Sequence, residues 1–493
     1  MFKVSPLFGD HAILPIGKEL RIFGKADEGE TIRACLTAKD GTVTGQGMST
    51  AREGCFLIHL PAQTIGAGPL TLTLTSDTMT WMATDLVTGC LFMAGGQSNM
   101  EWGLWNAEGG QDVIKTHDDP DLRYFNVPRV SVLDDAGLAA HDAAHWQQIA
   151  PHIGGDMSAV AYFFARELRA KLGLPVGIVG CNWGGTSILS WMDEVALNRS
   201  VPAMKAAADY ESKYGEIPLT EWQCKQDAFQ HDMDVWNAKV AEVKEANPGI
   251  EWAEVEKLAG VCPWNPPPGP GSPYRPGQLH RTMVDKIVPM ALNGILFYQG
   301  ESDVERAEVY GELLITLVTR WRELFGDAEL PFYNVQLPMF IDAGAKDDFR
   351  WAILRQQQEK AWKALRNSHL AVMLDAGEYG NIHPVDKVTP GTRLARLFLG
   401  DDETPRAIAK SMQNNVLTVT LTQPVTGDGE LFEIAGEDGV YVPANAELDG
   451  CSIRLSAKIV AHPVKARYAW VNWAKVHVFG ESGLPLAPFV LDD

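Results

Sequence analysis

Residues 91–102 read LFMAGGQSNMEW, an apolar run that gives way to two glycines and then to a serine, and this stretch decides the fold. The apolar run is typical of a buried strand, and glycine allows a sharp turn and a close approach of the backbone. We therefore expect a strand that turns into a helix with Ser98 at the turn. Most serines at such turns only cap a helix. Ser98 becomes a candidate nucleophile only if the chain supplies partners for it.

The pattern of apolar and polar residues changes twice along the chain. Between about residues 89 and 400, short apolar strands alternate with helical segments, which predicts a parallel sheet with crossover helices. Before and after that region, apolar and polar residues alternate with period two, which predicts two β modules. We expect an N-terminal β-sandwich at 1–88, an α/β core at 89–192 and 273–400, a helical insertion with a proline-rich loop at 193–272, and a C-terminal β module at 401–493.

Composition excludes several classes of protein. The 63 acidic and 42 basic side chains give a formal charge of −21, which repels nucleic acids and anionic membranes. The seven cysteines form no CxxC pair and no zinc-type spacing with histidine, so we expect small core residues in a reducing compartment and no metal. The start of the chain lacks an apolar signal region, and no window is apolar enough to span a membrane. A cytoplasmic location is the expectation.

Two further strand ends carry polar groups. In the stretch VGCNWGGTS at 179–187 a strand end runs into two adjacent glycines, and the amide of Gly184, or less favourably of Gly185, could donate to an oxyanion. A tight turn or a helix start is the alternative. The stretch ILFYQGESD at 295–303 offers the Gln299 amide as another donor and Glu301 as an acid or base. Its acidic residues could equally cap the next helix.

His383 is the candidate base. It follows a strand and a glycine-containing loop late in the α/β region, and Pro384 stiffens that loop. Histidine is the natural group to deprotonate serine near neutral pH. Most single histidines have no such role, so spacing alone does not decide whether His383 is the base.

Together and in this order, GQSNM at 96–100, WGGT at 183–186, YQGES at 298–302 and IHPVDK at 382–387 resemble the sialate O-acetylesterase family of the SGNH (GDSL-like) hydrolases. The resemblance extends to both ends of the chain. It implies an α/β fold with a flavodoxin-like three-layer α/β/α core between β modules. It also implies hydrolysis of an acetyl ester on a sugar without metal or cofactor.

The resemblance gives each matched residue a role. Ser98 attacks the acetyl carbonyl and His383 takes its proton, while the Ser98 amide, the Gly184 amide and the Gln299 side chain hold the oxyanion. Removing Gln299 is then expected to cost roughly 10²–10³ in kcat without unfolding the protein. The wider superfamily has asparagine where this chain has Gln299.

The third member of a catalytic triad is missing from its usual place. Many SGNH hydrolases have an aspartate three residues before the histidine, and here that residue is Gly380. We expect a backbone carbonyl of Gly380 or Asn381 to orient the ring. The alternatives are the carboxylates of Asp375, Glu378 and Asp386, with Glu301 as a further support.

The substrate class rests mainly on the resemblance. Fifteen tryptophans suit the apolar faces of sugar rings, and Trp183, Trp102, Asn99 and Arg355 are the candidate substrate contacts. The preferred function is a serine esterase acting on 9-O-acetylated sialic acid or a related acetylated saccharide. The alternatives are an acetylxylan-type esterase and a non-catalytic glycan-binding protein on a hydrolase scaffold. The sequence leaves the oligomeric state open.

Overall fold

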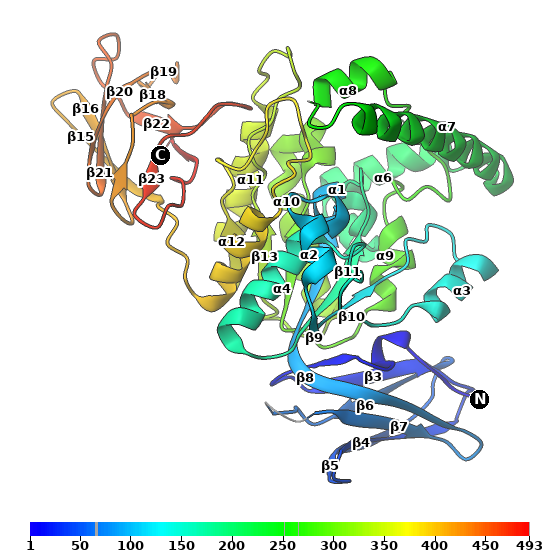
Figure 1. Cartoon of the computed structure of the whole chain (residues 1–493). Helices are drawn as coiled ribbons and strands as arrows, with labels where there is room; N and C mark the ends of the chain where they lie inside the picture. Colours follow the sequence, from blue (N-terminus) through cyan, green and yellow to red (C-terminus); the bar gives the residue numbers. More distant parts are fainter. Residues whose placement is uncertain (65–67, 251, 265, 493) are drawn as a thin grey trace.

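The computed structural model describes residues 1–64, 68–250, 252–264 and 266–492 and shows a mixed α/β architecture (Figure 1). A β-rich part at the N-terminus lies at the bottom of the view, an α/β part in the middle, and a second β-rich part at the upper left. The predicted proline-rich loop at 263–271 is described except at residue 265, which lies outside the described residues.

The N-terminal part is built from alternating strands. Along β7 the leucines at 70, 72 and 74 are buried and the threonines between them are half-buried, as expected for strands with one face on a core. The strands are β1 (Lys3–Val4), β2 (Ile13–Pro15), β3 (Leu20–Lys25), β4 (Thr31–Ala38), β5 (Val43–Thr50), β6 (Cys55–Leu60) and β7 (Leu70–Thr75). One sheet has the order β1-β3-β6, and β4 pairs with β5 and β7 in another.

Strand β8 (Thr80–Gly96) joins this part to the central sheet without interruption. Its first half pairs antiparallel with β7, as far as Leu86. Its second half, from Cys90 onward, pairs in parallel with central strands. The expected boundary at residue 88 therefore lies inside one continuous strand.

The central sheet has the order β10-β9-β11-β8-β12-β13-β14. Five neighbouring pairs are parallel, but β10 runs antiparallel to β9 at one edge, so the sheet is mixed rather than purely parallel as predicted. The remaining strands are β9 (Asp119–Asn126), β10 (Gln147–Ile149), β11 (Val176–Asn182), β12 (Gly294–Tyr298), β13 (Phe332–Val335) and β14 (Ser368–Ala371).

Helices cover both faces of this sheet. Phe92 of β8 packs against aromatic rings of α4 (Ala159–Leu172) and α12 (Val388–Leu399). Phe297 of β12 packs against Trp321 of α10 (Tyr310–Leu324). Phe92 lies beside Gly294, three residues before Phe297, and successive residues of a strand face opposite sides. The two rings therefore point to opposite faces, each under its own helices.

The other helices lie around the sheet and in the insertion. They are α1 (Ser98–Glu101), α2 (Gly110–Thr116), α3 (Asp135–Ala143), α5 (Glu194–Arg199), α6 (Val201–Tyr214), α7 (Leu219–Ala246), α8 (Trp252–Ala259), α9 (Gln278–Thr282) and α11 (Arg350–Ala364). The predicted insertion at 193–272 contains α5 to α8. Trp222 of α7 donates from its indole nitrogen to the Pro267 carbonyl at 2.9 Å, which fixes α7 to the proline-rich loop.

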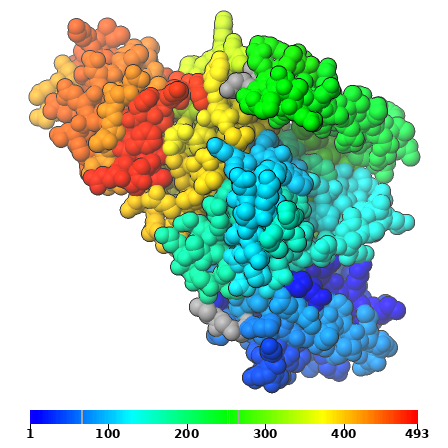
Figure 2. Space-filling model, viewed as in Figure 1, coloured from blue at the N-terminus to red at the C-terminus, as the bar shows by residue number. Residues whose placement is uncertain are grey.

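In Figure 2, α7 and α8, in green, lie above the cyan residues of the central part. No helix in the described ranges is long and apolar enough to cross a membrane.

The C-terminal part consists of small antiparallel sheets. They are formed by β15 (Ala407–Gln413), β16 (Val416–Leu421), β17 (Val425–Thr426), β18 (Phe432–Ala435), β19 (Val442–Pro443), β20 (Asn445–Asp449), β21 (Ser452–Ser456), β22 (Lys465–Tyr468), β23 (Phe479–Gly480) and β24 (Phe489–Leu491). Their core includes Met339, Val372 and Leu374 from the central part, so the two parts share apolar packing.

The cysteines differ from the expectation. Cys90 and Cys181 are buried, but Cys55, Cys224 and Cys451 are exposed. The prediction that all are core residues is wrong for these three.

Candidate active site

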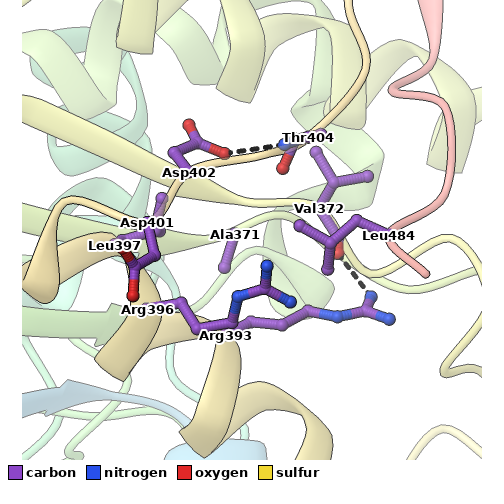
Figure 3. Close-up of a pocket in the computed structure, with 9 residues that line it drawn as sticks. All are labelled: Ala371, Val372, Arg393, Arg396, Leu397, Asp401, Asp402, Thr404 and Leu484. Atoms are coloured by element: carbon purple, nitrogen blue, oxygen red, sulfur yellow. Dashed lines mark hydrogen bonds between the residues drawn. The ribbon is translucent and has the colours of Figure 1, made fainter. Parts of the chain in front are cut away.

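One large cavity contains Ser98 and His383. Its volume is about 2190 Å³, and its wall runs from the ends of β8 and β11 to the insertion. A second hollow lies where α12 meets the C-terminal part, beside Arg393 and Leu484 (Figure 3). Its volume of about 10 Å³ suits about one water molecule, which excludes it as a sugar site.

The predicted turn from strand to helix is present at Ser98. Strand β8 ends at Gly96, and Ser98 is the first residue of α1. Gly96 has a φ of +133°, and a β-carbon there would lie 2.1 Å from the Tyr298 carbonyl oxygen. Only glycine fits at this position, so the close contact between β8 and β12 sets the direction in which the chain leaves the sheet.

His383 lies directly beside this serine. Its Nε2 is 2.8 Å from Ser98 Oγ. The imidazole stacks on the Trp102 indole with ring centroids 5.3 Å apart and an angle of 23° between the planes. Burial and the neighbouring Lys387 ammonium lower the pKa of His383 to about 4. The imidazole is therefore neutral at pH 7, the form that accepts a proton.

The carboxylates proposed as supports for His383 have other partners. Asp375 forms a bidentate ion pair with Arg393, both bonds being 2.7 Å long. Asp386 accepts hydrogen bonds from the first amides of α12. Among the described residues, no carboxylate forms an ion pair with the His383 ring.

Glu378 acts on the loop rather than on the ring. It accepts hydrogen bonds from Asn381 Nδ2 at 2.7 Å and from the Val385 amide at 2.9 Å. The Asn381 side chain in turn accepts from the His383 amide at 3.0 Å. The expected carbonyl of Gly380 or Asn381 makes no hydrogen bond to the ring within the described chain, so stacking on tryptophan holds the imidazole instead.

Asn99 is part of a buried network rather than a substrate contact. Its Nδ2 donates to Glu301 Oε1 at 2.6 Å and to the Ile382 carbonyl at 3.0 Å, and its Oδ1 accepts from Lys387 Nζ at 2.7 Å. Burial raises the pKa of Glu301 and lowers the pKa of Lys387 to about 7. Asn99 therefore links α1 to the loop that holds His383.

Gln299 is also buried away from the cavity. Its Nε2 faces three acceptors, Asp303 Oδ2 at 2.6 Å, Gln97 Oε1 at 3.1 Å and the Thr186 carbonyl at 3.2 Å. Its Oε1 accepts from the Tyr310 hydroxyl at 2.7 Å. An amide nitrogen has only two hydrogens, so Gln299 has none to offer an oxyanion in this conformation, contrary to the expected role.

The Gly184 amide lies near Ser98 but is already occupied. A β-carbon built on Gly184 would lie 3.4 Å from Ser98 Cβ, so this loop borders the nucleophile. The amide donates to Glu101 Oε2, and Glu101 also pairs with Arg129 at 2.5 Å. In this conformation a carboxylate stands where the predicted oxyanion would bind.

The remaining candidate contacts divide into two groups. Trp183 and Trp102 line the cavity as expected. Arg355 is fully buried and donates to the carbonyl of Val471 in the C-terminal part, and burial lowers its pKa to about 9. The prediction that Arg355 binds substrate is wrong, because it joins two parts of the fold.

Sequence reasoning missed Glu101 and Lys387. Both lie in quoted motifs, Glu101 three residues after Ser98 and Lys387 four residues after His383. For Glu101, the spacing of three residues from Ser98 on the predicted helix was the available signal. Lys387 lies on a loop, so helix periodicity could not have identified it. Within the described ranges, no group of three or more His, Cys, Asp or Glu side chains is placed to hold a metal ion.

Comparison with known proteins relates the chain to carbohydrate esterases. Residues 263–396 match the family described as carbohydrate esterase, sialic acid-specific acetylesterase. Rat sialate O-acetylesterase is 26% identical over 467 residues, with 85% of this chain and 80% of the relative covered. The human enzyme is 23% identical over 523 residues, with 95% and 88% covered.

A solved structure agrees with these relatives. The crystal structure of a carbohydrate acetylesterase from Xanthomonas citri matches with a TM-score of 0.75 and 26% identity, and all of both chains is covered. The similarity therefore extends over the β-rich parts as well as the central sheet.

Proposed function

Since this chain is a carboxylic ester hydrolase related to the sialate O-acetylesterases, we propose that it removes O-acetyl groups from saccharides with Ser98 as nucleophile and His383 as base. The observation that carries this proposal is the 2.8 Å contact between His383 Nε2 and Ser98 Oγ at the wall of the large cavity. A neutral imidazole at hydrogen-bond distance from a hydroxyl is the arrangement that general-base catalysis needs.

The reaction proceeds in two halves. Ser98 Oγ bonds to the acetyl carbonyl carbon while His383 Nε2 takes the hydroxyl proton. The bond between that carbon and the sugar oxygen then breaks, and His383 returns the proton to the leaving sugar oxygen. In the second half, His383 takes a proton from water as the water oxygen attacks the acetyl group, and acetate leaves as Ser98 recovers its proton.

The oxyanion is held by backbone amides in this proposal. The amides of Ser98 and Gly184 stabilise it once Glu101 has moved off the Gly184 amide. Gln299 instead positions the segments that follow β8 and β12, because it donates hydrogen bonds to Gln97 and Asp303 in these segments.

The substrate is an acetylated saccharide, and 9-O-acetylated sialic acid is the first candidate, since the rat and human relatives are sialate O-acetylesterases. The finer fold assignment belongs to the same proposal. The central sheet and its helices form a flavodoxin-like SGNH core, with β modules at 1–88 and 401–493 and the helical insertion at 193–272. The parallel neighbours of β8 support that assignment.

The test is a burst experiment with an aryl acetate and with 9-O-acetylsialate. The wild-type protein is expected to release the aryl alcohol in a burst and to carry one acetyl group on Ser98, detected by mass spectrometry of the quenched protein. Ser98→Ala is expected to lose about 10⁶ in kcat, as in other serine hydrolases. A Ser98→Ala protein that retains the burst would overturn the assignment. A wild-type protein silent on every acetyl ester would favour a glycan-binding protein.

A further inference from the structure

We propose that the cavity-facing side of α7, together with Trp264, binds the uncharged sugar units next to the acetylated one. This inference rests on the proposed function, because it takes the acetyl group to react at Ser98. It assigns the helical insertion a role in binding a saccharide longer than one unit.

The surface is continuous with the nucleophile. Gly184 borders Ser98, and at the next residue, Gly185, a β-carbon would lie 2.4 Å from the Trp264 ring. Trp264 contacts Tyr274 and Phe229 edge-on, with ring centroids 6.3 and 6.5 Å apart. A line of aromatic rings therefore leads from the reactive serine onto α7.

Along α7, one face of the helix continues this line. Gln226, Phe229, Gln230, Met233, Trp236 and Asn237 all line the cavity, at the spacing of three and four residues that places side chains on one face. Farther along, Trp236 contacts Trp252 of α8 edge-on at 6.2 Å. The face spans several turns of the helix, a length that suits a chain of sugars rather than a single ring.

The chemistry of that face differs from the rest of α7. Of the ten α7 residues that line the cavity, only Lys244 is charged. Residues of the same helix outside the lining include Glu221, Asp232, Lys239 and Glu242. Neutral amides donate and accept hydrogen bonds at once, and aromatic faces cover apolar faces of rings. This combination suits hydroxyl groups and sugar rings, and it gives an anionic unit little to pair with.

The cavity is larger than a single sugar needs. Small-molecule sites usually enclose about 300–1,000 Å³, and this cavity has about 2190 Å³. Trp264 keeps 46% of its surface exposed, although tryptophan is highly buried on average. Both observations fit a wall that is covered when a longer saccharide binds.

The test is calorimetric titration of the full-length protein with uncharged oligosaccharides that carry no acetyl group: xylohexaose, cellohexaose and lacto-N-tetraose. At least one is expected to bind more tightly than its monosaccharide, because several rings contact the wall. Phe229→Ala and Trp264→Ala are each expected to raise the Kd about tenfold, which corresponds to roughly 1.4 kcal/mol. Gln226→Ala, which removes only an amide, is a second variant should Phe229→Ala fail to fold.

Val235→Ala is the matched control, since Val235 lies on α7, is 57% exposed and does not line the cavity. Its Kd is expected to equal that of the wild type. The inference is overturned when none of the three oligosaccharides binds, when the wall variants bind as well as the control, or when only a trimer of sialic acid binds. Because these ligands carry no ester, their binding is independent of hydrolysis, so failure of the proposed function would leave this result standing.

Discussion

The candidate active site has two halves, the Ser98–His383 pair and the predicted oxyanion donors, and they differ in whether their groups are free to act in this conformation. Ser98 and His383 are already in contact at 2.8 Å. The two predicted donors beyond Ser98 are both engaged elsewhere, Gln299 with buried acceptors and Gly184 with the carboxylate of Glu101. The proposed nucleophile and base are thus in contact in this conformation, whereas the proposed oxyanion site requires the Glu101 side chain to move.

A hydrogen-bond donor can therefore lie close to Ser98 and still have no hydrogen free for an oxyanion. Gln299 and Gly184 lie at the strand ends where the sequence motifs predict them. A donor contributes to catalysis only when its hydrogen points at the oxygen that becomes charged. Substitutions of Gln299, Glu101, Lys387 and Asp375 test whether the Ser98–His383 pair and the occupied donors differ in this way.

Gln299→Ala is expected to destabilise the fold. It removes one hydrogen-bond partner from the buried Asp303 carboxylate and one from the buried Tyr310 hydroxyl, and each lost hydrogen bond costs about 0.5–1.5 kcal/mol. We expect unfolding in urea to begin at a clearly lower concentration than for the wild type. Gln413→Ala, at an exposed glutamine of β15, is the control. Full stability combined with a 10²–10³ loss of kcat would restore Gln299 as a direct oxyanion donor.

Glu101→Ala is expected to increase activity. The carboxylate that competes for the Gly184 amide is removed, and a gain of roughly 1 kcal/mol corresponds to about a fivefold rise in kcat/KM on an aryl acetate. Steady-state kinetics at several substrate concentrations measure the change. Glu108→Ala, at an exposed carboxylate near the same cavity, should leave kcat/KM unaltered. A fall in activity would mean that Glu101 assists the reaction.

The pH profile reports on the assembled pair. His383 must be neutral to accept a proton, and its pKa is lowered to about 4, so kcat/KM is expected to fall only as the pH drops toward 4. Lys387→Met removes a charge that lowers this pKa, so the acid limb should move to higher pH. Lys387→Arg should keep the limb near its wild-type position, and Lys475→Met is the control for an exposed lysine. An acid limb that stays in place in Lys387→Met would contradict this account.

Asp375→Asn is expected to have the smallest effect. Asp375 pairs with Arg393 rather than with His383, and a partly exposed ion pair contributes at most about 1 kcal/mol. We expect kcat/KM within about twofold of the wild type, measured beside His383→Ala. A loss as large as that of His383→Ala would make Asp375 the missing acid of a triad.

The sequence predicted the backbone of the site better than its hydrogen bonds. Gly96 and Ser98 follow directly from an apolar strand that meets two glycines, because local sterics dictate that turn. The partners of Gln299 do not, since Asp303 and Tyr310 come together with Gln97 only in the folded sheet.

The burial of Arg355 could not be predicted from the local sequence either. On a predicted helix it reads as a polar group available to an anion, yet it is fully buried against Val471. That contact depends on how the C-terminal part docks, which no local pattern encodes. The antiparallel edge strand β10 escaped prediction for a related reason, because three residues at 147–149 are too few to show a period.

Strand β8 runs from the N-terminal part through the central sheet and ends two residues before Ser98. At about 3.3 Å per residue, its 17 residues span roughly 55 Å, with Thr80 at one end and Gly96, two residues before Ser98, at the other. A chain shortened at residue 88 would therefore cut the strand that ends two residues before Ser98.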